Sequence, residues 1–127
     1  MNSEVYIQRD AYAARLGVEC IESGFENTVC RLVIKDDHAN GLGTTHGAVI
    51  FSLADIAFAC ACNASERTFV GVQTEIRYMR KAQGNELYAY ATLVSASKRF
   101  AHYQVAVKDG HDNKIAMFTG TACLLQT

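Results

Sequence analysis

The stretch that decides the fold is residues 46–65, HGAVIFSLADIAFACACNAS. It is rich in alanine and leucine, which favour a helix, and it is apolar on nearly every face that such a helix would have. A helix with this pattern has to be covered by the rest of the protein, so we expect it to be wholly buried. Its middle nevertheless carries a carboxylate, Asp55.

On both sides of this helix the sequence has the short β-branched and apolar runs that are typical of strands. Residues 18–23 and 27–34 predict a hairpin ahead of it, and the polar, glycine-bearing segment 35–45 predicts a loop. The remainder predicts strands and turns: strands at 69–79, 86–96, 101–108 and 114–125, a turn at Gln83-Gly84-Asn85 and a tight hairpin at Asp109-Gly110.

These elements predict an α+β fold in which a curved antiparallel sheet of five to six strands wraps around one long central helix, the hotdog arrangement. Residues 3–15 have the spacing of a short amphipathic N-terminal helix, which Gly17 ends. No linker, repeat or low-complexity segment divides the 127 residues, so we expect one domain over residues 1–127.

Composition excludes several classes of function. The formal net charge is −1 and the basic residues form no tract, which argues against nucleic acid and against an anionic membrane as partners. The N-terminus has no continuous apolar core of a signal peptide, and the apolar stretch from Ala48 to Cys62 is short for a membrane span. We therefore expect a cytoplasmic protein.

The cysteines and histidines do not predict a metal site. The five cysteines are odd in number and form no CxxC pair, which favours buried, reduced thiols: Cys20, Cys30, Cys60, Cys62 and Cys123. The histidines outside the helix, His38, His102 and His111, have no metal-ligand spacing. No metal and no cofactor is expected.

Asp55 is the first candidate for chemistry. Burying a carboxylate without a partner is costly, and no Lys or Arg lies one helical turn away on either side. One interpretation is structural, with Asp55 paired to a distant Arg or capping a backbone group. The other is a general base or nucleophile with a shifted pKa in an apolar cleft.

The start of the helix, His46-Gly47-Ala48, is the second candidate. The first-turn N–H groups of a helix have no intrahelical acceptor and attract negative charge, although Thr44 or Thr45 could simply cap them. Gly47 and Asp55 are eight residues apart, about 12 Å along one helix. If both act on one carbonyl, two chains must pack so that Asp55 of one faces Gly47 of the other.

The central stretch resembles the signature of the phenylacetate-degradation (PaaI-type) acyl-CoA thioesterases. The residues that carry the resemblance are Asn40, His46-Gly47-Ala48, Phe51, Leu53-Ala54-Asp55, Ala57-Phe58-Ala59, Cys62-Asn63 and the later Ile76-Arg77-Tyr78-Met79-Arg80. The similarity extends from about residue 17 to the end of the chain. It departs from the family where Ala48 replaces a second glycine and Lys81 a proline.

The resemblance implies a hotdog fold, a homotetramer built from dimers, and hydrolysis of an acyl-CoA thioester. It implies that Asp55 is the catalytic acid and that the Gly47 N–H contributes to the oxyanion hole. It also implies that His46 is the motif histidine beside Gly47 and that Asn40 lies near the reacting thioester. Asn40-Gly41 is also an ordinary turn dipeptide, and His46 could serve only to start the helix. The hydroxyl that orients the acid or water in some relatives falls near Gly71 here, and Thr74 is the nearby alternative.

Other residues are candidates for binding the substrate. Arg80, Lys81, Lys98 and Arg99 are near predicted strand ends and could meet CoA phosphates, or could simply be solvated. Phe51, Phe58 and Tyr78 could line an aryl pocket or belong to the core. We expect an aryl-acyl-CoA thioesterase; the alternatives are a hotdog acyl-CoA hydratase or dehydratase, and a non-catalytic acyl-CoA-binding module.

Overall fold

Six strands form one antiparallel sheet in the computed structural model, which describes residues 3–126. The strand order across the sheet is β1-β2-β4-β5-β6-β3, so β1 and β3 are the two edges. The strands are β1 (Glu19–Glu22), β2 (Asn27–Val33), β3 (Thr68–Tyr78), β4 (Glu86–Ala96), β5 (Phe100–Asp109) and β6 (Lys114–Gln126).

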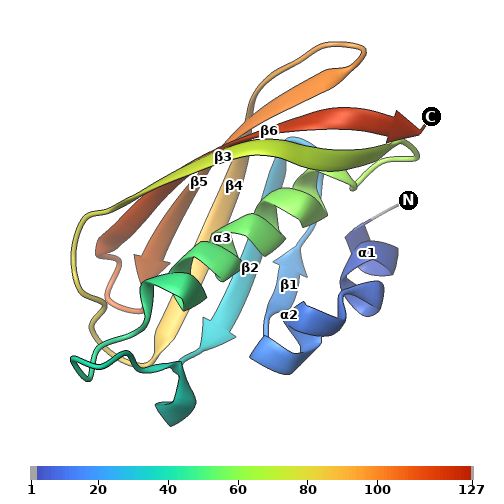
Figure 1. Cartoon of the computed structure of the whole chain (residues 1–127). Coiled ribbons are helices and arrows are strands. Elements are labelled where there is room, and N and C mark those ends of the chain that lie inside the picture. Colours follow the sequence, from blue (N-terminus) through green and yellow to red (C-terminus); the bar gives the residue numbers. More distant parts are fainter. Residues whose placement is uncertain (1–2, 127) are drawn as a thin grey trace.

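One long helix, α3 (Gly47–Cys62), lies against one face of this curved sheet (Figure 1). Its inward residues are fully buried, among them Leu53, Ala57 and Cys60. They pack on the inward side chains of the strands, which alternate with outward polar residues as a half-buried sheet requires: Leu32, Leu87, Val105, Val107, Ile115 and Phe118 are all fully buried. The predicted arrangement of sheet and central helix is therefore what the chain adopts.

The expectation that α3 is wholly buried is wrong for a single chain. A stripe along the helix stays partly or fully open, formed by Ala48, Phe51, Ser52, Asp55 and Ala59. These positions recur at helical spacing and therefore share one face, directed away from the sheet. The sheet covers only the other side, because one chain supplies a single layer of strands.

The N-terminal segment forms two short helices where the sequence predicts one. These are α1 (Ser3–Arg9) and α2 (Ala11–Leu16), and Asp10 separates them. Asp10 leaves the helical conformation and its carboxylate accepts the Ala13 N–H at 2.9 Å, which is an N-cap bond that starts a new helix. Gly17 ends α2 with a left-handed φ of 94°, as predicted.

Two loops also differ in detail from their prediction. The loop before α3 contains a 3-10 turn, η1 (Asp36–His38), that the polar sequence does not reveal. The turn between β5 and β6 is longer than an Asp-Gly hairpin, and its left-handed residue is Asp112 rather than Gly110. The reason is Asp109, whose carboxylate accepts the N–H groups of His111 and Asn113 at 3.0 Å each and so shapes a wider loop.

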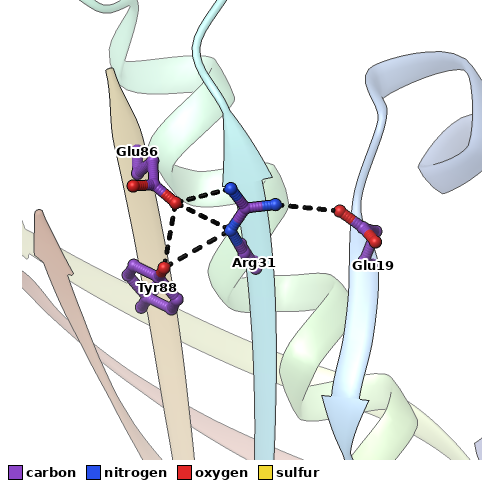
Figure 2. A network of polar contacts seen from close by, with 4 residues as sticks. All are labelled: Glu19, Arg31, Glu86 and Tyr88. Carbon is purple, nitrogen blue, oxygen red and sulfur yellow. Dashed lines mark hydrogen bonds and ion pairs between the residues drawn. The ribbon is translucent and has the colours of Figure 1, made fainter. Parts of the chain in front are cut away.

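The short edge strand β1 is fastened to the sheet by an ionic network on the outer face (Figure 2). Arg31 of β2 contacts Glu19 of β1 at 3.1 Å and Glu86 of β4 at 2.6 Å, and Tyr88 donates to Glu86 at 2.9 Å. The register that places Arg31 opposite both Glu19 and Tyr88 makes this network.

Among the described residues, no helix is long and apolar enough to cross a membrane.

Candidate functional site

A cavity of about 500 Å³ lies between α3, α1 and the start of β3. Four of the predicted site residues line it: Asp55, Phe51, Phe58 and Thr74. The rest of its lining is mostly apolar or small: Tyr6, Ala59, Cys62, Asn63, Phe69, Val70, Gly71, Val72 and Gln73. A predominantly apolar cavity with one acidic group is the composition expected of a small-molecule site.

Asp55 is the single acidic group in that lining, and it is half-buried. Burial raises the pKa of its carboxyl group, and the negative charge of Asp10 raises it further. Within residues 3–126, no hydrogen bond or ion pair holds the Asp55 carboxylate. The described part of the chain therefore gives Asp55 no Arg partner and no backbone group to cap, and the carboxylate lines the cavity.

Gly71, near which the sequence resemblance predicts an orienting hydroxyl, lies on the strand wall of the cavity. A side-chain Cβ at Gly71 would lie 3.0 Å from the Phe58 ring, so this position accepts no serine or threonine unless Phe58 moves. Thr74 lies three residues further along β3, beyond a break in the strand register, and lines the same cavity. Thr74 is thus the hydroxyl of β3 that remains available.

The two phenylalanines of α3 have different surroundings. Phe58 is 1% exposed and packs against Tyr103 and Phe118, with ring centroids 5.8 and 5.7 Å away, so it belongs to the core and forms the floor of the cavity. Phe51 is half-buried, packs edge-on against Phe118 and also lines the cavity.

The helix start is built differently from the expected threonine cap. His46 is itself the N-cap of α3: its Nδ1 accepts the Ala48 N–H at 3.0 Å, and its carbonyl accepts from Val49 and Ile50. Thr44 instead donates its hydroxyl to Asn40, and Thr45 pairs with Ala39. The Gly47 N–H makes none of these hydrogen bonds to His46, so it is the first-turn donor that the cap does not use.

Tyr78 lies against Gly47 rather than in the Asp55 cavity. Its hydroxyl donates to the Gly47 carbonyl at 3.0 Å, and a Cβ at Gly47 would lie 3.3 Å from its ring. Within one chain Tyr78 therefore holds the helix start and does not line the Asp55 cavity, and its role in an aryl pocket stays a prediction.

Asn40 shapes the loop that leads into α3. Its side-chain oxygen accepts the N–H groups of Leu42 and Thr44 at 2.9 and 3.1 Å, as an asparagine in a turn does. Its structural role in the turn is plain, and this role holds the chain just ahead of His46.

The four basic residues are at strand ends, as the sequence indicates, but at opposite ends of β3. Arg80 and Lys81 follow the end of β3 near Gly47, and Lys81 shares a surface pocket with the loop before α3. Lys98 and Arg99 connect β4 to β5 beside the other end, where their carbonyls accept from Arg67 and Leu124. One substrate phosphate cannot contact both pairs within a single chain.

Three residues at the site carry no sequence signal for their role. Tyr6 enters the cavity from α1, and burial together with Asp10 raises its pKa. Asp10 acts on the Asp55 carboxyl group from the break between α1 and α2. Asn63 clamps the end of α3 to β3, since its amide accepts from Phe69 N–H at 2.8 Å and donates to the carbonyls of Phe69 and Ala59 at 3.2 and 3.0 Å.

Comparison with known proteins identifies the family of this chain. Residues 42–116, which include α3 and most of the sheet, match the family model described as the thioesterase superfamily. The chain belongs to the thioesterase superfamily. Family membership confirms the predicted enzyme class, and the central motif of the helix lies within the matched region.

Individual relatives place the chain more closely. A protein of Archaeoglobus fulgidus is 37% identical over 71% of this chain, and the match spans 59% of that protein's length. The acyl-coenzyme A thioesterase PaaI of Escherichia coli is 29% identical over 94% of this chain and 86% of the relative. The solved E. coli PaaI structure superimposes with a TM-score of 0.92 at 27% identity, covering 98% of this chain and 91% of that one. The predicted PaaI-type hotdog fold is therefore confirmed.

Proposed function

We propose that this thioesterase-superfamily protein hydrolyses an acyl-CoA to a free acid and CoA, with Asp55 as the catalytic carboxylate. The observation that carries the proposal is an Asp55 carboxyl group with a raised pKa and no partner among residues 3–126, at the wall of an apolar cavity. A carboxylate in these surroundings is a stronger base than an exposed one, which suits proton transfer from water near neutral pH. The name of the E. coli relative supports the acyl-CoA substrate.

In the proposed reaction the thioester oxygen accepts the Gly47 N–H at the positive end of α3, which stabilises the developing oxyanion. Asp55 acts from the other side of the carbonyl. It either takes a proton from the attacking water or attacks the carbonyl carbon itself to form a mixed anhydride that water then cleaves. In both routes the C–S bond breaks, and CoA leaves as a thiolate that takes up a proton.

We infer that two chains build each site. Gly47 and Asp55 lie about 12 Å apart along α3, too far to contact one carbonyl. The open stripe of α3 and the edge strand β3 leave apolar surface uncovered in one chain, including Val70 and Val72, which are 47% and 57% exposed. A second copy packed against α3 and β3 about a two-fold axis would cover this surface and bring Asp55 of one chain to Gly47 of the other.

The acyl group we propose is an aryl-acyl group such as phenylacetyl or hydroxyphenylacetyl. The half-buried ring of Phe51 provides an aromatic surface beside Asp55, and the buried ring of Phe58 closes the cavity behind it. An aryl group can stack or pack edge-on against Phe51 and gains about 0.5–1.5 kcal/mol beyond the apolar area it buries, which an alkyl group does not. Thr74, across the cavity on β3, is the hydroxyl that we propose orients the water or the carboxylate.

For the CoA phosphates we propose Arg80 and Lys81, because they follow Tyr78 and so lie at the Gly47 end of β3. Lys98 and Arg99 form the second candidate pair, at the other end. Replacing Arg80 and Lys81 together by alanine is expected to raise KM about tenfold with little change in kcat, since these contacts do not change between substrate and transition state. If instead only the Lys98/Arg99 double variant raised KM by this amount, the phosphates would be assigned to the other end of β3.

We also propose that two dimers assemble into a tetramer and that the protein works in the cytoplasm. The tetramer rests on the resemblance to PaaI-type thioesterases. The compartment is supported by the cysteines, all five of which are free thiols, because a reducing environment keeps such thiols unpaired.

A thiol-release assay over a panel of aryl- and alkyl-acyl-CoAs tests the proposal. The wild-type protein should release CoA fastest from the aryl substrates. Asp55→Asn keeps the size of the side chain and should lower kcat by about 10²–10⁴ while leaving CoA binding intact. If no substrate releases thiol, a binding module is favoured. If the protein adds water to an enoyl-CoA without releasing thiol, a hydratase is favoured. Near-normal turnover by Asp55→Asn would refute the assignment of Asp55.

A further inference from the structure

Three cysteines meet on the side of α3 away from Asp55. Cys20 is on β1, Cys30 on β2 and Cys60 on α3, and their sulfur atoms all lie within 4.8 Å of one another. Cys30 and Cys60 are fully buried, whereas Cys20 is partly exposed at the sheet edge. The thiol cluster, Cys20-Cys30-Cys60, is therefore enclosed on the inside and reachable from the β1 edge.

Strand register and helix phase bring these residues together. Cys20 and Cys30 are directly opposite in the β1–β2 pair, which places their side chains on the same face of the sheet. Cys60 is five residues beyond Asp55, about 140° around the helix, so it faces β1 and β2 while Asp55 faces the cavity. The remaining cysteines lie elsewhere: Cys62 lines the Asp55 cavity, and Cys123 is on β6.

The separation of the sulfur atoms suits one metal ion. Three sulfurs bound to one ion at about 2.3 Å in a plane are about 4.0 Å apart. Each sulfur of the thiol cluster would move by roughly 0.5 Å or less to reach that geometry, a shift that side-chain rotation can provide. Sulfur ligands select soft ions over hard ones such as Mg²⁺ or Ca²⁺.

We propose that Cys20, Cys30 and Cys60 form a binding site for one soft d10 metal ion, such as Cu(I) or Zn(II), held by three thiolate sulfurs. On binding, each of the three S–H groups loses its proton to solvent and forms a sulfur–metal bond, with no change in oxidation state. Water can occupy a fourth position on the open side of Cys20. The ion links the edge strand β1 to α3, and since it binds only the folded chain, it stabilises the fold.

The test uses fully reduced, metal-free protein under anaerobic conditions, with Cd(II) as the spectroscopic probe. Wild-type protein should bind one equivalent, with sulfur-to-metal charge-transfer absorption, release of protons and a rise in Tm. Separate arms with Zn(II) and Cu(I), each against a competing chelator, identify which soft ion the site prefers. If the wild-type protein binds neither Zn(II) nor Cu(I) more tightly than the serine variants described below, the proposal is overturned.

Matched serine variants locate the site. Cys20→Ser and Cys60→Ser should each weaken Cd(II) binding at least about tenfold, whereas Cys62→Ser and Cys123→Ser should leave it unchanged. Cys20 is partly exposed, so Cys20→Ser keeps the test decisive even where the buried Cys60→Ser variant does not fold. Wild-type affinity in Cys20→Ser, or loss of binding in Cys62→Ser, would overturn the assignment. Asp55→Asn should bind Cd(II) like the wild type, so this result is independent of the proposed hydrolysis.

Discussion

The carboxyl group of Asp55, the catalytic residue that we propose, opposes folding. Burial and the charge of Asp10 both raise its pKa, so the ionised form is less favourable in the folded chain than in the unfolded one. The folded state therefore holds this proton more tightly, and the free energy of unfolding falls as pH rises through the pKa of Asp55. Function and stability thus make opposite demands on one side chain.

We predict that Asp55→Asn is more stable than the wild type near neutral pH, although we expect it to have lost most of its activity. The amide carries no charge to bury, so the gain should be present above the raised pKa of Asp55 and should vanish at a pH where the wild-type carboxyl group is protonated. Urea unfolding at both pH values measures it. Equal stability of the two proteins at neutral pH would mean that Asp55 ionises without cost.

We predict that Asp10→Asn shifts the acid limb of the kcat/KM profile to lower pH. Removing the negative charge of Asp10 removes one cause of the raised pKa of Asp55, so the base stays ionised at lower pH. Asparagine is also a good N-cap, so α2 should keep its start. Asp112→Asn, on the distant β5–β6 turn, is the charge-matched control, and an equal shift there would refute the local effect.

A pair of variants at Gly47 isolates the role of its N–H. Gly47→Pro removes that donor at the first helical position, where proline is well tolerated, and the His46 backbone at φ −62° and ψ 136° suits a residue before proline. We expect it to lower kcat by about 10²–10³. Gly47→Ala keeps the N–H and adds only the Cβ that meets Tyr78. If the two variants lose the same activity, crowding against Tyr78 explains the loss.

At the scale of elements, the site depends on how firmly α3 is joined to β3. Asn63 makes three hydrogen bonds at this junction, and it is 4% exposed. One wall of the Asp55 cavity comes from α3 and another from β3, so this junction sets the distance between them.

We therefore predict that Asn63→Ala lowers the free energy of unfolding by about 1–3 kcal/mol, since it removes the acceptor of the buried Phe69 N–H and the side-chain donor to the Phe69 and Ala59 carbonyls. Asn63→Asp keeps the acceptor for the Phe69 N–H but sets a carboxylate oxygen against the Phe69 and Ala59 carbonyls, so it should lose at least as much at neutral pH and less at acidic pH, where the protonated carboxyl group can donate. Denaturant unfolding of both variants measures the difference. A change in Asn63→Ala within about 0.5 kcal/mol, as at an ordinary surface position, would contradict this role.

At the scale of the whole molecule, the prediction concerns two chains. Asp55→Asn and Gly47→Pro homodimers should both be nearly inactive. A mixed dimer of one Asp55→Asn chain and one Gly47→Pro chain has one intact site and one doubly altered site, if each site takes Asp55 and Gly47 from different chains.

Unfolding and refolding an equal mixture of the two variants should therefore restore about a quarter of wild-type activity, because half of randomly formed dimers are mixed and each has half its sites intact. If Asp55 and Gly47 of the same chain worked together, the mixture would be as inactive as its components. Analytical ultracentrifugation of the wild type, the variants and the mixture verifies that all have the same assembly state.

The sequence by itself determined the parts of this protein that depend on local patterns. Strand alternation, turn residues and the apolar run of α3 predicted five to six strands and the central helix to within a few residues, and the isolation of Asp55 in that run marked the candidate site. Local rules also failed in places. The cap at Asp10, which splits the N-terminal helix, and the wider turn at Asp109 depend on side-chain bonds that periodicity does not register.

Only the tertiary structure decided which side chains come into contact. Docking of α1 brought Tyr6 and Asp10 to Asp55, and antiparallel pairing sent Arg80 and Arg99 to opposite ends of β3. The register of β1 on β2 and the phase of α3 gathered Cys20, Cys30 and Cys60, which have no motif spacing. The reason is physical: periodicity states which face of an element is apolar, whereas register and helix phase, fixed by packing between distant segments, state which side chains come into contact.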